Sequence, residues 1–358
     1  MSFNHRIIQV KNKLGKMNLD GLYVTNLTNV RYLTGFTGSA GSLLILENKN
    51  HFFTDGRYIE QSNEQIKNCT IHIVSSSHYA EIKNKKLLLK NQRIGIEGDF
   101  ISVNLYDNIK AVMSDIQLEK IEDIIGVIAA VKDEHEIESL KTAIEITDKV
   151  FNLILPDLKI GAVEKEIAAK ISYLFKMNGA EGDSYDSIIG SGYLGALPHA
   201  RPTEKEFEKG DFVVMDFGAL YNGYHADMTR TVVVGEATSR HKEIYGIVFE
   251  SQLAGINYAK AGITGAALDK KCRKVIDDAG YGDKFIHSTG HGLGLEVHTY
   301  PRISSFNKLP LLENYVITIE PGIYIPGWGG VRIEDDCLIK NNQCIPLNQS
   351  PKEMLILK

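Results

Sequence analysis

Two acidic residues flank a predicted hairpin turn in the second half of the chain. Asp216 and Asp227 lie on either side of the segment LYNGY, in which Asn222-Gly223 is a strong signal for a two-residue turn between antiparallel strands. A turn at these positions sets a register in which Asp216 and Asp227 project from the same face as near neighbours. Because the strand before Asp216 is apolar, the two carboxylates are poorly solvated and repel each other unless a cation neutralises them. The pair therefore indicates a metal site.

More residues that could bind a metal occur nearer the C-terminus. Glu320 ends the apolar strand VITIE, and in VRIEDD the residues Arg332 and Glu334 share one face of a strand. The segment HSTGHGLGLEVH carries three histidines among glycines, which argue against the helical HExxH zinc motif but allow backbone to approach a ligand. These histidines are His287, His291 and His298.

The predicted ligand set is rich in oxygen, with four carboxylates and one histidine. Such a set favours Mn²⁺, Co²⁺ or similar ions over a sulfur-lined structural zinc site. Four carboxylates also exceed what one divalent ion needs, whereas two ions about 3.5–4 Å apart, bridged by carboxylates and a water, use them all. Such a pair of ions lowers the pKa of the water and polarises a carbonyl group, so the residues indicate metal-assisted hydrolysis.

Two other motif matches fail because of the residues around them. GSGYLG (190–195) matches the G-x-G-x-x-G dinucleotide fingerprint, but Pro198 and Pro202 prevent the phosphate-binding helix that should follow. The tripeptide DFG (216–218) matches a kinase motif, yet the chain has no HRD catalytic loop and no VAIK lysine. Neither a dinucleotide site nor a kinase site is predicted.

The second half of the chain contains an internal repeat, which predicts two equivalent halves around a central cleft. Each half has two glycines around a helical pattern, then a Gly-rich loop ending in His-x-x-Pro, then an apolar strand with an acid two residues before a glycine. The matching pairs are Gly161 and Gly262, Gly179 and Gly280, His199 and His298, and Asp216 and Glu320. This pseudo-two-fold arrangement would bring equivalent loops and acids together.

The first part of the chain alternates short apolar runs with helical patterns, which predicts an α/β domain. The expected strands cover 20–25, 42–47, 51–55, 71–74 and 93–98, and the expected helices cover 7–16 and 59–66. Helical spacing of apolar residues resumes over 134–155. We therefore expect an N-terminal α/β domain over 1–126 and a catalytic α+β domain over 127–358.

The composition excludes several classes of protein. Among 358 residues, 40 Lys and Arg face 45 Asp and Glu, and the formal net charge of −5 argues against nucleic acid or an anionic membrane as a partner. No stretch of about 18 unbroken apolar residues predicts a membrane span, and the N-terminal residues do not form a signal peptide. The four cysteines form no CxxC motif or disulfide framework, so free thiols in a reducing cytoplasm are expected.

These residues resemble the motifs of the pita-bread metallopeptidases, a family that includes methionine aminopeptidase, aminopeptidase P, prolidase and creatinase. The resemblance covers most of the chain and is carried, in order, by SIIGSGYLGALPH, VVMDFGALYNGYHADMTRT, STGHGLGLEVH, VITIEPGIYIPG and VRIEDD. It implies two divalent ions per chain, with Mn²⁺ expected and Co, Zn or Fe as alternatives, and it implies a homodimer.

The resemblance also implies roles for individual residues. Asp216 chelates one metal, His291 and Glu320 hold the second, and Asp227 and Glu334 bridge the two. Glu320 also takes the proton from the bridging water, which is the nucleophile. The implied substrate-binding residues are His199, His287, His298 and Arg332. Of these, His199 and His298 are expected to be catalytic as well, and Arg332 to hold a bridging carboxylate in place.

The segments LTNVRYLTGFTGSAG and FTDGRY resemble the creatinase-type N-terminal domain of the Xaa-Pro enzymes, which disfavours a plain methionine aminopeptidase. All five metal ligands stand in the sequence, which disfavours the metal-free creatinase and a non-catalytic peptide-binding protein on the same fold. We expect an Xaa-Pro aminopeptidase acting on small proline-containing peptides, with Xaa-Pro dipeptidase (prolidase) as the alternative. In a dipeptidase, Arg201 and Arg302 are candidates to bind the free carboxylate of proline.

Asp227→Asn or Glu334→Gln should abolish turnover with little loss of folding, because each substitution removes a bridging negative charge. Peptide hydrolysis and metal analysis of the purified variants, beside the unaltered chain, check this expectation. A variant that keeps two ions per chain and near-normal activity would contradict the bridging assignment.

Overall fold

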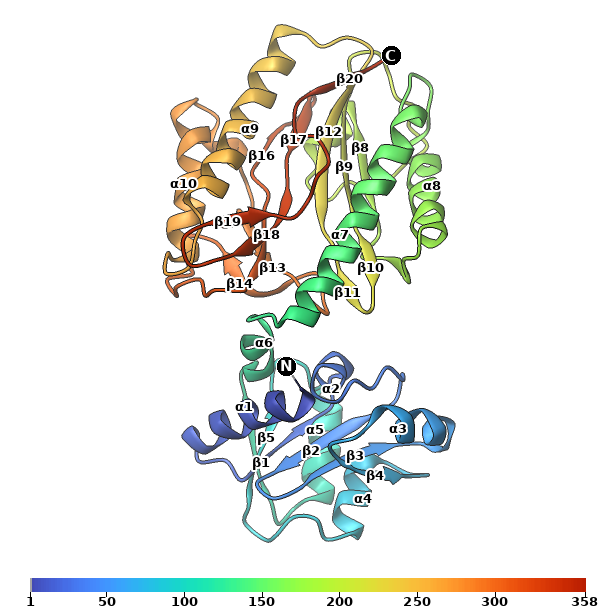
Figure 1. Cartoon of the computed structure of the whole chain (residues 1–358), viewed down its shortest axis with the longest axis vertical. Helices are drawn as coiled ribbons and strands as arrows, with labels where there is room; N and C mark the ends of the chain where they lie inside the picture. The colour runs from blue at the N-terminus through green and yellow to red at the C-terminus, as the bar shows by residue number, and fades with distance from the viewer. Residues whose placement is uncertain (1) are drawn as a thin grey trace. The chain divides into compact units, whose positions relative to one another are not determined.

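The computed structural model describes residues 2–358, and the contacts divide the chain into two compact units (Figure 1). The first unit ends at Ala129 and the second begins at Ala130. The last helix of the first unit, α6 (Ile124–Ala129), packs against α1 (Phe3–Lys16). The expected boundary at residue 126 lies within α6.

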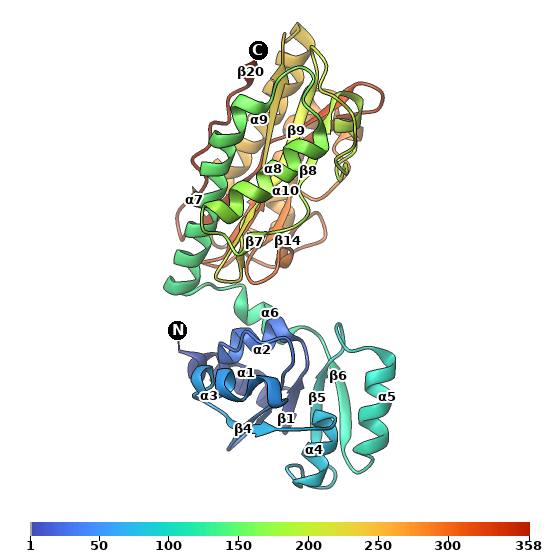
Figure 2. The same cartoon turned by 90° about the vertical axis from the view of Figure 1, so that its right-hand side faces the viewer.

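The first unit is a six-stranded mixed sheet with helices, as the sequence predicted (Figure 2). In the order in which they lie in the sheet, the strands are β4 (Thr70–Ile73), β3 (Asn50–Thr54), β2 (Ser42–Leu46), β1 (Gly21–Val24), β5 (Arg93–Glu97) and β6 (Gln117–Ile121). The remaining helices are α2 (Leu27–Thr34), α3 (Ile59–Gln65), α4 (His78–Asn84) and α5 (Val103–Val112), with a 3-10 turn η1 (Gly56–Tyr58). All of the expected strands and helices are present, and β6, α2, α4, α5, α6 and η1 are additional.

The helices of the second unit confirm the repeat. They are α7 (Glu134–Ile154), α8 (Glu164–Met177), α9 (Ser239–Tyr258) and α10 (Gly265–Asp278). The repeated glycines bracket α8 and α10, and all have positive φ, at 83° and 95° for Gly161 and Gly179 and at 90° and 85° for Gly262 and Gly280. A Cβ at any of these positions would meet no atom within 4 Å, so the backbone conformation and not a lack of space favours glycine.

The strands of the two halves also pair in the same order, always antiparallel. In the first half β9 (Phe212–Phe217) lies between β8 (Ile188–Ser191) and β12 (Met228–Val234). In the second half β15 (Val316–Ile319) lies between β13 (Gly290–Gly292) and β18 (Asp335–Ile339). The other elements are β7 (Gly182–Asp183), β10 (Ala219–Tyr221), β11 (Tyr224–His225), β14 (Thr299–Ile303), β16 (Gly322–Ile325), β17 (Gly329–Arg332), β19 (Cys344–Pro346), β20 (Leu355–Leu357), η2 (Leu155–Asp157), η3 (Gly192–Ala196) and η4 (Gly282–Lys284).

The Asn222-Gly223 turn forms as predicted. Both residues have positive φ, at 49° and 73°, and Tyr221 pairs with Tyr224 across the turn. The same register continues into β9 and β12, where Asp216 faces Thr229. Between these two ladders the two antiparallel segments come very close at Gly218, where a Cβ would lie 1.7 Å from the carbonyl oxygen of Ala226, so only glycine fits.

The segment 190–195, which matches the dinucleotide fingerprint, leads into the short 3-10 helix η3 and not into an α-helix, as predicted from the prolines that follow it. Within residues 2–358, no helix is both long enough and apolar enough to cross a membrane.

Candidate active site

A cleft of about 510 Å³ in the second unit contains the residues that the sequence singled out. Its walls include all of the predicted ligands and substrate-binding residues, namely Asp216, Asp227, His291, Glu320, Glu334, His199, His287, His298 and Arg332. Acids from strands that are distant in the sequence therefore meet in one place. This convergence is what the predicted pseudo-two-fold repeat requires.

Two of the acids and one histidine form the tightest group. Single ligand atoms of Asp227, His291 and Glu334 all lie within 4.8 Å of one another. The Nε2 atom of His291 is 3.6 Å from Oδ2 of Asp227 and 3.5 Å from Oε1 of Glu320. Asp216 lies beside this group, because the hydroxyl of Tyr185 lies within hydrogen-bond distance of both Asp216 and Asp227 and can donate its one proton to either.

Burial makes the cluster unfavourable to charge. It raises the pKa of Asp227 and of Glu334 well above the usual range, and neighbouring carboxylates raise both further. Burial also raises the pKa of Glu320 from 4.5 to about 7, with Asp216 adding to the shift and Arg332 opposing it. Carboxylates in this state are stabilised by a bound cation, which removes both the repulsion and the uncompensated charge.

The orientation of His291 fits a metal ligand. Its Nδ1 atom is 3.1 Å from the carbonyl oxygen of Gly292, so the Nδ1–H donates there and the lone pair of Nε2 faces the carboxylates. Burial, and then His298, lower the pKa of His291 to about 4, so the ring is neutral at pH 7. A neutral imidazole beside buried carboxylates is a donor set suited to divalent ions.

Arg332 and Tyr185 hold the acids from the side of β17 and from the segment before β8. The Arg332 guanidinium is buried, and its Nη2 lies 2.5 Å from Oδ2 of Asp216. Its Nε donates to the hydroxyl of Thr229, which in turn donates to Oε2 of Glu334 at 2.6 Å. The direct ion pair of Arg332 is therefore with Asp216, and its link to the expected bridging residue Glu334 runs through Thr229.

Tyr185 was not predicted from the sequence. Burial and the charges of Asp216 and Asp227 raise its pKa well above the usual range, so the phenol keeps its one proton, which it can donate to either acid. Tyr185 lies outside the repeat motifs and the acid–glycine pattern that marked the other residues, so nothing in the sequence signalled it.

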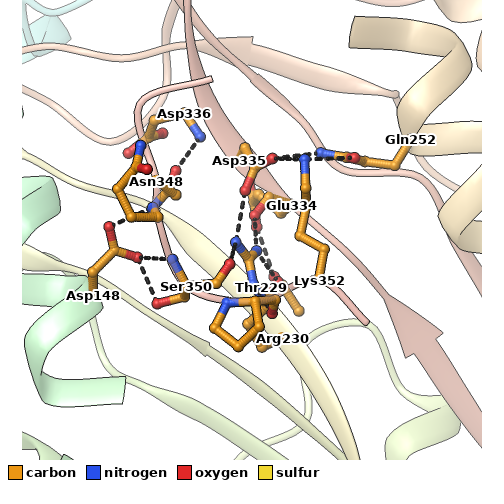
Figure 3. Close-up of polar contacts among 12 residues, drawn as sticks. Asp148, Thr229, Arg230, Gln252, Glu334, Asp335, Asp336, Asn348, Ser350 and Lys352 are labelled. Atoms are coloured by element: carbon orange, nitrogen blue, oxygen red, sulfur yellow. Dashed lines mark hydrogen bonds and ion pairs between the residues drawn. The ribbon is translucent and has the colours of Figure 1, made fainter. Parts of the chain in front are cut away.

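A second layer of polar contacts (Figure 3) fixes the backbone at Glu334, between β17 and β18, and at Asp227, between β11 and β12. The fully buried Arg230 donates to the carbonyl oxygen of Glu334 at 2.5 Å and to Oδ1 of Asp335 at 2.7 Å. Although burial alone would raise the pKa of Asp335, Arg230 and Lys352 lower it. One residue further on, the buried carboxylate of Asp336 accepts the backbone N–H of Asp227 at 3.0 Å.

The same layer anchors the chain beyond β19. Arg230 also donates to the carbonyl oxygens of Ser350 and Pro351, and Asp148 on α7 accepts the N–H and hydroxyl of Ser350 (Figure 3). Lys352 donates to Asp335 at 2.7 Å. This network could not be predicted from the sequence, because its members come from segments that only tertiary packing brings together.

The predicted substrate histidines line the cleft but are held differently. His287 bonds through Nδ1 to the carbonyl oxygen of Ser288 and through Nε2 to the hydroxyl of Tyr324, at 2.7 and 2.9 Å. The exposed His298 has its ring 4.2 Å from that of His291, measured between centroids. His199 is exposed and forms no hydrogen bond to another of residues 2–358, so its ring is free to contact a ligand.

Residues 138–341 match the metallopeptidase family M24, and residues 6–130 match the creatinase/prolidase N-terminal domain. The chain belongs to metallopeptidase family M24, the pita-bread family that its motifs resemble, and it is therefore an enzyme of the metallopeptidase class.

Named relatives share nearly the whole chain. A solved Xaa-Pro dipeptidase from Bacillus anthracis is 38% identical, with a TM-score of 0.97 over 99% of this chain and 100% of that one. An X-Pro aminopeptidase structure from Thermotoga maritima is 39% identical, with a TM-score of 0.88 over 95% and 98%. The Xaa-Pro dipeptidase of Pyrococcus furiosus is 40% identical over 94% of this chain and 96% of its own.

The stability of the metal-free protein should fall as pH rises. The unfolded chain releases the Glu320 proton near pH 4.5, whereas the folded chain holds it until about pH 7, so the folded state binds more protons between these values and loses stability across them. Melting temperatures measured in chelator should therefore be lower at about pH 8 than at about pH 5.

Glu320→Gln is the matched control, because it removes this titrating carboxyl and keeps its shape. The melting temperature of the metal-free variant relative to the unaltered chain should rise with pH. A difference that does not change with pH would contradict the role of burial at Glu320.

Proposed function

We propose that this chain is an Xaa-Pro peptidase, which hydrolyses the bond between an N-terminal residue and a following proline with the help of divalent metal ions. The observation that carries the proposal is that a single cleft is lined by four acids, by the His291 imidazole with its Nε2 lone pair toward them, and by Arg302, which has no ion pair within residues 2–358. The names of the relatives support the same chemistry, since they include Xaa-Pro dipeptidases and an X-Pro aminopeptidase.

We infer that two ions are bound, with Mn²⁺ favoured by the oxygen-rich donors and Co, Zn or Fe as alternatives. The residues that would hold them are Asp216, Asp227, His291, Glu320 and Glu334. Divalent ions at this place supply Lewis-acid polarisation of the scissile carbonyl and of an attacking water.

The side chains of the cleft supply the proton transfers and the hydrogen bonds. The Glu320 carboxylate lines the cleft with its Oε1 3.5 Å from Nε2 of His291, and it is assigned to take a proton from the attacking water. Burial and the charge of Arg302 lower the pKa of His298, so its imidazole is neutral and can donate an N–H to an oxyanion. His199, the equivalent of His298 in the other half of the repeat, is assigned to bind the substrate.

Recognition of proline has to rely on shape. An Xaa-Pro bond has no amide N–H, so the enzyme cannot select its substrate by accepting that hydrogen bond. The cleft wall contains apolar residues suited to the pyrrolidine ring, namely Ile188, Pro198 and Val297.

Arg302 favours the dipeptide among Xaa-Pro substrates. Arg201 forms an ion pair with Asp186 at 2.8 Å, but Arg302 lines the cleft with no ion pair to any of residues 2–358. A guanidinium in that position can bind the free carboxylate of a C-terminal proline. We therefore place dipeptidase activity first and cleavage of Xaa-Pro-Yaa second, the latter supported by the relative named as an aminopeptidase.

We further propose a cytoplasmic location and a homodimer. The cysteines described in residues 2–358 are all free thiols, which suits a reducing compartment. The dimer follows from the resemblance to the family, and sedimentation of the purified chain tests it.

Arg302→Met should lower kcat/KM for Ala-Pro by about 10- to 100-fold, the size expected for losing a charge-assisted hydrogen bond. Cleavage of Ala-Pro-Ala should change by less than about threefold, because its proline has no free carboxylate. Arg201→Met is the matched control and should leave both substrates nearly unchanged. Equal losses for the two peptides would refute the carboxylate contact, and cleavage of Met-Ala-Ala alone would refute the proline assignment.

His199→Ala and His298→Ala should keep both metals yet lose about 10²–10³ in kcat, since each removes a hydrogen-bond donor to the substrate or the oxyanion. Steady-state kinetics with metal analysis on the same samples measures both quantities. Loss of metal in either variant would instead make that histidine a metal ligand.

A further inference from the structure

Glu164, the first residue of α8, is a fully buried acid that lies outside the cleft lining. Both of its carboxylate oxygens are saturated. Oε1 accepts the N–H and the hydroxyl of Ser191, each at 2.8 Å, and Oε2 accepts the N–H and the hydroxyl of Thr203, at 2.9 and 2.7 Å. One side chain therefore joins two residues that are separated in sequence by the Gly-rich loop.

Ser191 and Thr203 are the two ends of the segment that carries His199. Ser191 is the last residue of β8, and the chain then passes through η3 and His199 before it reaches Thr203. The segment folds back on β8 so closely that a Cβ on Gly190 would lie 3.0 Å from the Cβ of Ala200. The Glu164 carboxylate closes the base of this loop.

The other fixed point of the segment is at its tip. Nη1 of Arg332 donates to the carbonyl oxygen of Pro198 at 3.1 Å, and Pro198 immediately precedes His199. Since the His199 ring itself bonds to none of residues 2–358, the backbone of this loop sets its position. Glu164 at the base and Arg332 at the tip are thus buried polar contacts that can fix where the imidazole meets the substrate, whereas the Arg201–Asp186 ion pair of the same segment is exposed.

We propose that Glu164 is a positioning residue for His199. The proposal rests on the proposed function, in which His199 contacts the substrate. All four donors to Glu164 are neutral, and two of them are backbone N–H groups that cannot reverse direction. Two acceptor oxygens are therefore needed, because an amide of the same shape would turn its NH₂ group toward one of these N–H donors.

Glu164→Gln tests the proposal, with Glu166→Gln as the matched control, because Glu166 is an exposed acid on the same turn of α8. We expect Glu164→Gln to keep both metals and to lower kcat for the Xaa-Pro substrate about 10- to 100-fold, within the loss expected for His199→Ala. The control should stay within about twofold of the unaltered chain. An unchanged kcat in Glu164→Gln would overturn the proposal.

A double-mutant cycle separates positioning from a general structural effect. If Glu164 acts through His199, adding Glu164→Gln to His199→Ala should lower kcat by less than about twofold further. The same loss in both backgrounds would show that Glu164 acts independently of His199 and would overturn the proposal. Thr203→Val, which removes one hydroxyl donor and keeps the carboxylate, provides a milder variant should Glu164→Gln fold poorly, and it should show the same dependence on His199.

Hydrogen exchange of the peptide covering residues 191–203 gives a readout that does not depend on activity. Glu164→Gln should speed exchange in this segment and leave the segments that carry Asp216 and Glu334 unchanged. Unaltered exchange over 191–203 would refute the role of Glu164 in holding this loop, whatever the enzyme cleaves. If exchange changes as expected but no Xaa-Pro peptide is cleaved by the unaltered chain, the proposed function fails and the role of Glu164 in holding the loop stands.

Discussion

Repulsion between buried carboxylates is the constraint on which the second unit depends. Asp216, Asp227, Glu320 and Glu334 come from both halves of the repeat and crowd into one cleft, where burial opposes their ionisation. Every charge kept there has to be balanced by a cation, a proton or a strong donor. The Arg332 guanidinium and the Tyr185 phenol beside the acids meet part of this demand from the protein side, whereas the neutral His291 offers a lone pair that only a cation can use.

The repeated fold meets this constraint with rigid strands. In the first half, the tight turn at Asn222-Gly223 sets the register that places Asp216 and Asp227 on one face. Gly218 allows the two antiparallel segments to approach closely between these acids. In the second half Glu320 directly follows β15 and Glu334 directly precedes β18, and these two strands pair with each other as β9 and β12 do. The acids are thereby held by backbone ladders, while the histidines assigned to the substrate lie on loops.

Residues outside the cleft hold both the acids and these loops in place. Arg230 and Asp336 bind the backbone of Glu334 and Asp227, and Ser350, which lies beyond β19, accepts a further hydrogen bond from Arg230. Glu164 joins the ends of the His199 loop through a buried carboxylate whose two oxygens each accept two hydrogen bonds. Buried polar groups of this kind specify one arrangement, because any other leaves them unsatisfied.

The class of fold, the repeat and the acids that are candidate metal ligands could be predicted from the sequence. Each of these follows from local chemistry: glycines at positions of positive φ, a two-residue turn that sets register parity, and acids ending apolar strands. The hydrogen bonds described above for Tyr185, Arg230 and Glu164 depend on tertiary packing. The partners in these bonds lie 27 or more residues away in the chain, and no periodicity or short motif records which distant partner a buried group will meet. The same holds for Arg201 and Arg302, which look alike in their motifs until packing gives one an acidic partner and leaves the other facing the cleft.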